Sequence, residues 1–400
     1  MNVLISGVGV AGPTLAFWLK QYGFTPTLLE EARALRTSGY VIDFWGTGFD
    51  IAEKMGLLPR LMQSGYRVND VRFVDERGER VGGFSVEIFN KLTAGRYITI
   101  ARSDLSAAIY DSLRGEVETI FGEQICDLKF DCDKVQATFR QLKPREFDIV
   151  IGADGLHSDV RQLLFASDSK YETYLGYKVA AFETTGYRPR DELTYVAFNR
   201  PGMQIARFAM RGDRTLFLMI YADANPRCPQ SSDLPAQKRE LHACFDGLGW
   251  ECDQILGAMD RCQSIYLDSV SQVRMPIWFR GRGALIGDAA AAPSLLAGQG
   301  AALAMIEAYV LAGELSLSPR NPTVAFASYE ARLRKFVETK QIGAGRFAGA
   351  LAPKTEIGLR FRNLVTRAMD LPFVAEWAAG SQIRDQIELP SYALPTARAA

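Results

Sequence analysis

The residues of this chain best suited to chemistry form two glycine-rich segments that lie far apart. The first contains Gly7, Gly9, Ala11 and Gly12. Glycines at this spacing turn the chain tightly after a strand and let the backbone approach a pyrophosphate. The helix that follows would direct its first N–H groups, and the positive end of its dipole, at the same phosphates. This segment therefore predicts a site for a dinucleotide.

The sequence also predicts the strands that must position this segment. Residues 2–6 form a short apolar run, which is typical of a buried parallel strand. A second strand over residues 25–29 ends in Glu30, at the distance where an acidic residue holds the ribose hydroxyls. Glu30 disfavours a 2′-phosphate, because two negative charges would meet there. A purely structural turn is the alternative.

The second segment would serve the other end of the ligand. It follows an apolar strand over residues 283–286, and its distinctive residues are Gly287, Asp288, Pro293, Gly298 and Gly300. The helix predicted over residues 301–312 is apolar on almost every side, so it should be buried. Its N-terminus offers free N–H groups to an anion such as the N1–C2=O edge of a reduced flavin. The two segments together predict that the chain binds FAD.

Two shorter motifs lie between these segments. A strand beginning at Asp148 leads into Asp154-Gly155, after which Ser158 can cap a short helix that carries Arg161. Arg102 precedes another helix, whose N-cap is predicted at Ser103 or Asp104, and its guanidinium could reach a phosphate or ribityl oxygen. A capped junction and a solvated arginine are the structural alternatives.

In this order, the motifs resemble the class A flavoprotein aromatic hydroxylases, the para-hydroxybenzoate hydroxylase-like FAD monooxygenases. The likeness covers the framework of residues 1–330, and residues 39–48 and 298–315 are most similar to the tetracycline-inactivating and polyketide-modifying branch. The chain departs from the family pattern at two places. Ala291 stands where many members have a histidine, and Ala301 and Ala302 stand where an asparagine is usual. Both departures remove polar contacts near the flavin and leave the backbone cradle.

The resemblance implies a reaction in which NADPH or NADH reduces FAD, O2 forms a C4a-hydroperoxide, and one oxygen passes to an aromatic or polyketide-type substrate. Such chemistry needs a dry, well-shaped pocket more than acid–base side chains. No catalytic side chain is therefore assigned. The alternatives are an FAD reductase or desaturase of the same fold, a flavin-dependent halogenase, and a flavin-binding redox sensor.

The composition disfavours nucleic-acid-binding and metal-binding proteins. Lys plus Arg and Asp plus Glu both number 46, so no net charge would attract nucleic acid. Six cysteines without close pairs and only two histidines, His157 and His242, predict no metal site and free thiols in a reducing cytoplasm. No apolar run is expected to cross a bilayer. The oligomeric state cannot be read.

The spacing of the motifs predicts an α/β fold with three parts. A Rossmann-like, discontinuous FAD-binding domain would comprise residues 1–70, 100–167 and 276–323. An inserted antiparallel-sheet substrate domain would comprise residues 71–99 and 168–275, and C-terminal helices would occupy 324–400. The candidates to line the substrate pocket are apolar or aromatic: Trp45, Phe198, Met203, Phe208 and Phe217.

Overall fold

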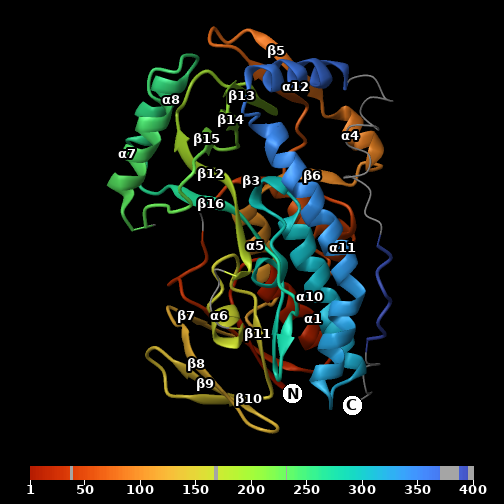
Figure 1. The fold of residues 1–400 in the computed structure, drawn as a ribbon. Helices are drawn as coiled ribbons and strands as arrows, with labels where there is room; N and C mark the ends of the chain where they lie inside the picture. The colour runs from red at the N-terminus through yellow and green to blue at the C-terminus, as the bar shows by residue number, and fades with distance from the viewer. Residues whose placement is uncertain (37–38, 166–169, 231, 370–386, 395–400) are drawn as a thin grey trace.

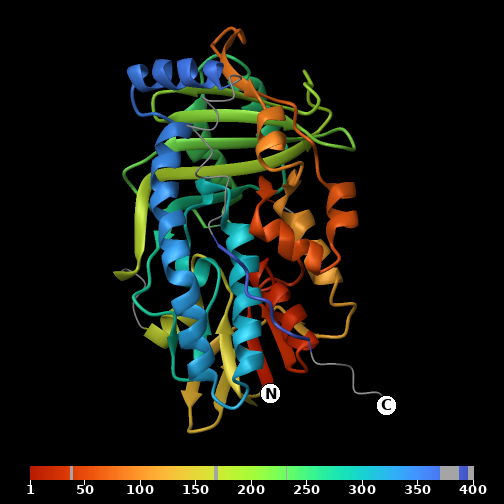
Figure 2. The same cartoon turned by 90° about the vertical axis from the view of Figure 1, so that its right-hand side faces the viewer.

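Two sheets organise the computed structural model, which describes residues 1–36, 39–165, 170–230, 232–369 and 387–394. A six-stranded sheet lies in the half that contains the N-terminus, and a seven-stranded sheet lies in the other half (Figures 1 and 2). The predicted mixture of a Rossmann-like sheet, an antiparallel sheet and C-terminal helices is confirmed. The exact domain limits stay a prediction.

The six-stranded sheet is parallel apart from one edge strand. In spatial order its strands are β17 (Phe279–Arg280), β18 (Gly283–Leu285), β11 (Ile149–Gly152), β1 (Asn2–Ser6), β2 (Thr25–Glu30) and β7 (Glu118–Phe121). Only β17 runs antiparallel to its neighbour. The apolar runs predicted from sequence form its centre, because a parallel sheet covered on both faces requires apolar side chains on both.

Shorter helices and a smaller sheet complete the fold. The shorter helices are α2 (Thr47–Lys54), α3 (Leu58–Ser64), α4 (Glu87–Leu92), α5 (Arg102–Asp111), α6 (Asp159–Phe165) and α9 (Asp288–Ala291), with the 3₁₀ helix η2 (Leu295–Ala297). A three-stranded sheet contains β8 (Ile125–Phe130), β9 (Val135–Phe139) and β10 (Arg145–Phe147).

The long helix α10 (Gly300–Leu317) packs between α1 (Ala11–Gln21) and α11 (Pro322–Leu351). Its residues are buried from Leu303 to Leu315, which confirms that this apolar helix belongs to the core. By length and composition α10 could cross a membrane, so the expectation that no run is long enough was wrong. However, 72% of its apolar window is buried inside the protein.

The seven-stranded sheet confirms the prediction of a second, largely antiparallel sheet. In spatial order it contains β16 (Tyr266–Val273), β12 (Glu172–Thr185), β15 (Arg214–Ala222), β14 (Met203–Ala209), β13 (Thr194–Arg200), β4 (Asp70–Val74) and β5 (Arg80–Ser85). All neighbours are antiparallel except β13 and β4. Helices α7 (Leu234–Phe245) and α8 (Cys252–Met259) pack on one face of this sheet (Figure 1). The other face meets the two-stranded ribbon of β3 (Val41–Trp45) and β6 (Tyr97–Ala101).

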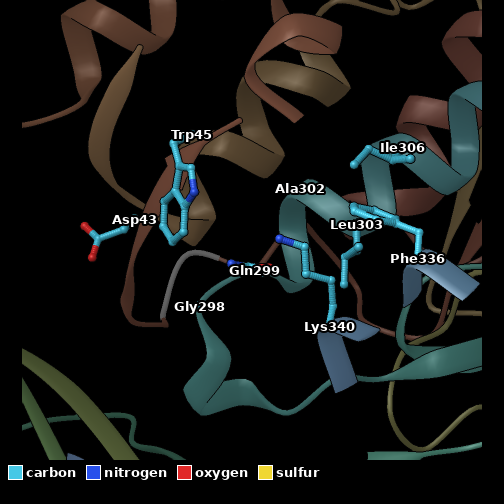
Figure 3. Close-up of a pocket in the computed structure, with 9 residues that line it drawn as sticks. All are labelled: Asp43, Trp45, Gly298, Gln299, Ala302, Leu303, Ile306, Phe336 and Lys340. Carbon is cyan, nitrogen blue, oxygen red and sulfur yellow. The ribbon is translucent and has the colours of Figure 1, made fainter. Parts of the chain in front are cut away.

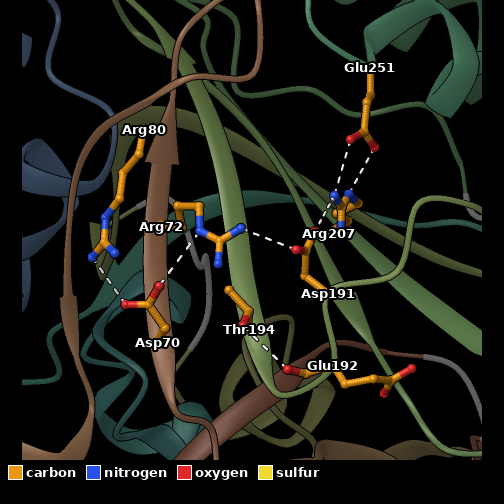
Figure 4. A network of polar contacts seen from close by, with 8 residues as sticks. All are labelled: Asp70, Arg72, Arg80, Asp191, Glu192, Thr194, Arg207 and Glu251. Atoms are coloured by element: carbon orange, nitrogen blue, oxygen red, sulfur yellow. Dashed lines mark hydrogen bonds and ion pairs between the residues drawn. The ribbon is translucent and has the colours of Figure 1, made fainter.

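A chain of alternating charges ties the edge strands to α8 (Figure 4). Its successive members are Arg80, Asp70, Arg72, Asp191, Arg207 and Glu251. Arg207 is buried, with Nε 2.8 Å from Glu251 Oε2 and Nη2 2.7 Å from Asp191 Oδ2. The exposed end at Arg80 lies 3.1 Å from Asp70. The network therefore combines a buried pair with a solvated one.

Arg207→Leu should lower the free energy of unfolding by about 3 kcal/mol, because it leaves the partly buried Glu251 without its cation and leaves Asp191 with Arg72 alone. The matched change Arg80→Leu removes an exposed pair and should cost less than about 1 kcal/mol. Urea unfolding of both variants measures the difference. If both variants lost the same unfolding free energy, the burial of an ion pair would not determine its contribution to stability in this network.

The last described helix, α12 (Glu356–Ala368), leaves part of its apolar surface exposed. The side chains of Ile357, Phe361 and Leu364 lie along one stripe of this helix, and they are 82%, 63% and 65% exposed. The helix packs on β5 and β13 through its opposite side, where Thr366 Oγ1 accepts a hydrogen bond from Gly83 N. The polar contact with β5, and not the apolar stripe, therefore sets which side of α12 faces the protein. Residues 370–386 and 395–400 of the predicted C-terminal part lie outside the described residues.

Candidate functional site

A long cavity of about 430 Å³ opens where the carboxyl ends of the parallel strands meet. This is the position at which open α/β sheets bind ligands. Nine of the residues predicted to bind the cofactor line it: Gly7, Gly9, Ala11, Glu30, Arg102, Asp154, Asp288, Gly298 and Gly300. Tertiary structure therefore brings together four motifs that are far apart in sequence.

The first glycines differ in what they do. At Gly7, φ is +107°, and a Cβ atom would come within 2.3 Å of Ala153 O. At Gly12, a Cβ atom would lie 2.0 Å from Gly7 O, so this residue packs directly against the backbone of the loop. Gly12 does not line the cavity. Gly9 has no such neighbour, since only Arg102 Nη2 would lie within 4 Å, at 3.8 Å. Gly7 and Gly12 shape the turn, and Gly9 keeps the cavity open.

Glu30 is held at the edge of this loop by backbone N–H groups. Its Oε2 accepts a hydrogen bond from Val8 N at 2.9 Å, and its Oε1 accepts one from Ala32 N at 3.1 Å. The helix after the loop, α1, begins without a side-chain cap, so the N–H groups of its first turn have no side-chain cap acceptor. The carboxylate of Glu30 and the start of α1 both line the long cavity.

Asp154 lines the cavity and belongs to a hydrogen-bonded strand–helix junction. Its carboxylate accepts hydrogen bonds from Ser158 Oγ at 2.5 Å and Val160 N at 3.1 Å, and burial raises its pKa to about 6. Ser158 Oγ accepts from Arg161 N at 3.0 Å, which confirms the predicted helix cap. The buried Arg161 donates to Ala289 O at 3.1 Å and so joins this junction to the second glycine-rich segment.

Arg102 and Asp288 face the cavity from opposite segments. Burial raises the pKa of Asp288, and the positive charge of Arg102 opposes that rise. Arg102 also interacts electrostatically with Tyr40 and Tyr266. Arg102 is itself the first residue of α5, whose N-cap is Ala101, so the prediction of a cap at Ser103 or Asp104 was wrong. The guanidinium therefore projects from a helix start, over the glycine loop.

Sequence reasoning did not single out Glu307, the acid that supports the second segment. Its Oε2 accepts hydrogen bonds from Gly287 N at 2.5 Å and from Tyr329 Oη at 3.1 Å. Burial raises its pKa to about 8. The sequence signal that could have identified it is a glutamate in the middle of an apolar run. Gly287 and Pro293 do not line the cavity, and Pro293 O accepts a hydrogen bond from Gln272 Nε2 at 2.7 Å.

The predicted substrate-pocket residues lie on two different faces of the seven-stranded sheet. Phe198 and Phe217 belong to the core beneath α7 and α8, and Met203 packs against the same core, so their assignment to the pocket was wrong. Phe208 and Trp45 belong to the cluster on the opposite face, beside β3 and β6. Successive side chains of a strand point to opposite faces, and aromatic character alone does not say which face is which.

A second, small pocket of about 10 Å³ adjoins the long cavity on that opposite face (Figure 3). We call it the β3 pocket, and its lining residues are Asp43, Trp45, Gly298, Gln299, Ala302, Leu303, Ile306, Phe336 and Lys340. Gly298 lines both spaces. The small side chain of Ala302 also packs closely on α2, because a Cβ atom at Gly48 would lie 2.6 Å from it. This close approach accounts for an alanine where the family usually has an asparagine.

Comparison with known proteins agrees with this geometry. Residues 1–339 match the FAD binding domain family. A flavin-dependent monooxygenase of an unknown prokaryotic organism is 32% identical over 341 residues, which span 85% of this chain and 87% of the relative. The crystal structure of tetracycline destructase Tet(51) superposes with a TM-score of 0.83 at 29% identity, spanning 98% of this chain and 99% of that chain.

The fold is also that of HpxO of Klebsiella pneumoniae, whose structure contains FAD and uric acid. That superposition has a TM-score of 0.80 at 21% identity and spans 97% of this chain and 98% of HpxO. The glycine loop, the Asp154 junction and the Gly287-Asp288 segment surround one cavity, as a single long dinucleotide requires. The chain therefore belongs to the class A FAD-dependent monooxygenases.

Proposed function

We propose that this FAD-dependent monooxygenase uses NADPH or NADH and O2 to add one oxygen atom to a conjugated aromatic or polyketide-type small molecule. The supporting observation is the long cavity, which is lined by residues of the four motifs that carry the resemblance to the aromatic hydroxylases. The similarity to a tetracycline destructase over almost the whole chain points to the same substrate class. Because reduced nicotinamide is available in the cytoplasm, the proposal places the reaction there.

The residues present fit FAD, and we propose a role for each part of the long cavity. Gly7, Gly9 and the start of α1 would hold the pyrophosphate, and Glu30 would hold the adenine-side ribose. Arg102, Asp154 and Asp288 would meet phosphate and ribityl groups.

The remaining predicted residues, Ala11, Gly12, Gly287, Pro293, Gly298 and Gly300, would shape the backbone around the cofactor. FAD, when bound, supplies the redox chemistry and the activation of oxygen. The protein would orient the substrate at the end of the cavity formed by Gly298 and α10, and would exclude water there. The uncapped start of α10 would stabilise negative charge at that end.

The experiment is a substrate panel of simple phenols, anthraquinones and tetracyclines. It measures NADPH and NADH loss, oxygen consumption and a mass gain of one oxygen atom in the product. We expect that a polycyclic compound accelerates NAD(P)H loss and gains one oxygen. NAD(P)H oxidation that changes the substrate without oxygen gain would indicate a reductase or desaturase. Halide incorporation would indicate a halogenase, and the absence of turnover with every compound would favour a redox sensor.

Asp288→Ala should weaken FAD binding about 10- to 100-fold, which corresponds to losing one charge-assisted hydrogen bond. Asp288 is half-buried and lines the cavity, whereas His242 lies on α7 and pairs with Asp260 at 3.0 Å. The control His242→Ala should therefore keep wild-type FAD content and turnover. Fluorescence titration of the FAD-free proteins measures the dissociation constants. Unchanged FAD affinity in the Asp288 variant would refute its assignment to the cofactor.

A further inference from the structure

Two contacts join the walls of the long cavity. In the first, His157 Nε2 lies 3.1 Å from Asp268 Oδ1. In the second, the centres of the Tyr40 and Tyr266 rings lie 5.6 Å apart. All four residues line the cavity. His157 and Tyr40 lie in segments that follow β11 and β2 of the six-stranded sheet, whereas Tyr266 and Asp268 lie on β16 of the seven-stranded sheet. The two halves of the molecule therefore touch each other at the cavity.

The strand β16 holds the acidic partner of the first contact in place. Tyr266 and Asp268 are two residues apart on this strand, so their side chains point to the same face. Asp268 Oδ1 accepts a hydrogen bond from Ser269 N at 2.8 Å, and Oδ2 accepts one from Tyr266 Oη at 3.4 Å. The carboxylate is thus oriented by its own strand. Only the His157 side chain has to be ordered when the pair forms.

The pair of His157 and Asp268 lies where the cavity meets solvent. Among the described residues that line the cavity, the exposed ones are Glu31, Ala34, Arg36 and His157. These residues therefore mark the mouth of the cavity. A ligand that leaves the cavity has to pass this mouth, and the pair connects the two walls there. We call the pair of His157 and Asp268 the clasp.

The charge on the clasp depends on pH, because histidine titrates in the physiological range. Three charged groups face the imidazole of His157: Asp268 on β16, Glu172 on β12 and Arg161 on α6. The hydrogen bond to Asp268 raises the pKa of His157, and burial and Arg161 oppose the rise. The imidazole is therefore charged below this raised pKa and neutral above it. Because a charge-assisted hydrogen bond is the stronger one, the clasp weakens as pH rises through the pKa.

We infer that His157 and Asp268 form a proton-dependent clasp that retains FAD in the long cavity. In this role His157 is a positioning residue, which acts on the cofactor by holding the two walls together. The inference rests on the proposed placement of FAD in the cavity and is independent of the substrate. It predicts that FAD leaves the protein faster as the pH rises.

The test measures the rate at which FAD leaves the diluted holoenzyme, by timed ultrafiltration and the flavin absorbance of the filtrate, between about pH 5.5 and pH 8.5. For wild type we expect release to be about threefold faster at the alkaline end, the effect of one exposed ion pair. His157→Gln cannot become charged and should release FAD at the fast rate throughout. His157→Lys stays charged and should keep the slow rate throughout. A pH effect shared by all three proteins reports other groups, such as Asp154.

The chain offers a matched control in a second histidine–aspartate pair. His242 Nε2, on α7, lies 3.0 Å from Asp260 Oδ1, at the end of α8, and neither residue lines the cavity. His242→Gln should therefore keep the wild-type release rate and its pH dependence. Both pairs are exposed, so the melting temperatures of the FAD-free variants should stay close to that of wild type. This comparison separates the clasp from a general loss of stability.

The outcomes separate the clasp from the proposed function. The same pH dependence in wild type and His157→Gln overturns the clasp. Release by His157→Lys that is as fast as release by His157→Gln overturns it as well, because the charge then does not retain FAD. If the clasp behaves as expected but no substrate gains oxygen, the clasp is supported and the proposed oxygen insertion is refuted. If a substrate gains oxygen but wild type shows no pH dependence beyond that of His157→Gln, the clasp alone is refuted.

Discussion

Gly9→Val should give a protein that folds but purifies without flavin. A Cβ atom at Gly9 would meet only Arg102 Nη2, at an ordinary contact distance of 3.8 Å, so the fold has room for it. Gly9 lines the long cavity, and a branched side chain there would fill the space proposed for the pyrophosphate. The flavin absorbance of the purified protein measures the loss. The melting temperature should match that of FAD-free wild type.

Gly12→Val is the contrasting change at the same loop. Its Cβ atom would lie 2.0 Å from Gly7 O, and a backbone atom cannot move aside as a flexible side chain can. We therefore expect Gly12→Val to melt well below FAD-free wild type, or to be insoluble, in addition to losing flavin. A yellow, active Gly9→Val protein would refute the pyrophosphate assignment. Equal destabilisation by both changes would refute the division of roles between the two glycines.

Glu307→Gln should make the FAD-free protein more stable than wild type at alkaline pH. The pKa of Glu307 is raised by burial from 4.5 to about 8, so the folded state keeps a proton that the unfolded chain releases. The associated stability is fully present below the unfolded pKa and is lost as pH rises through the folded pKa. The slope is about 1.4 kcal/mol per pH unit in this window. Glutamine cannot titrate, and its oxygen can still accept from Gly287 N.

Urea unfolding between pH 5 and pH 9 gives the two stability curves. We expect wild type and Glu307→Gln to be similar at the acidic end and to differ by about 4 kcal/mol at the alkaline end. A smaller slope of the same sign should remain in the variant, because the pKa of Asp154 is also raised, to about 6. The control Glu338→Gln, at an exposed position on α11, should follow wild type. Parallel curves for wild type and Glu307→Gln would show that Glu307 does not hold this proton.

The sequence by itself determined the parts of the fold that depend on local pattern. The strand, glycine turn and helix around Gly7 to Gly12 were predicted within a residue or two, because each step depends on neighbouring residues. The same holds for the cap at Ser158 and for the buried helix α10, whose composition alone excludes a solvated face. The order of these motifs was sufficient to predict FAD and the class of enzyme.

Tertiary structure decided which side chains share a space. Phe198 and Phe208 are alike in composition, yet strand alternation and the position of α7 and α8 place them on opposite faces of the sheet. The exposed side of α12 was decided by polar contacts such as that of Thr366 with Gly83, against the apolar pattern of the helix. Glu307 gains its role from the donor Gly287 N and from burial between helices, which the local sequence pattern marks only as one charge within an apolar run. Local sequence patterns were therefore sufficient to predict the cofactor, whereas long-range packing decides which side chains lie beside the cavity that would hold it.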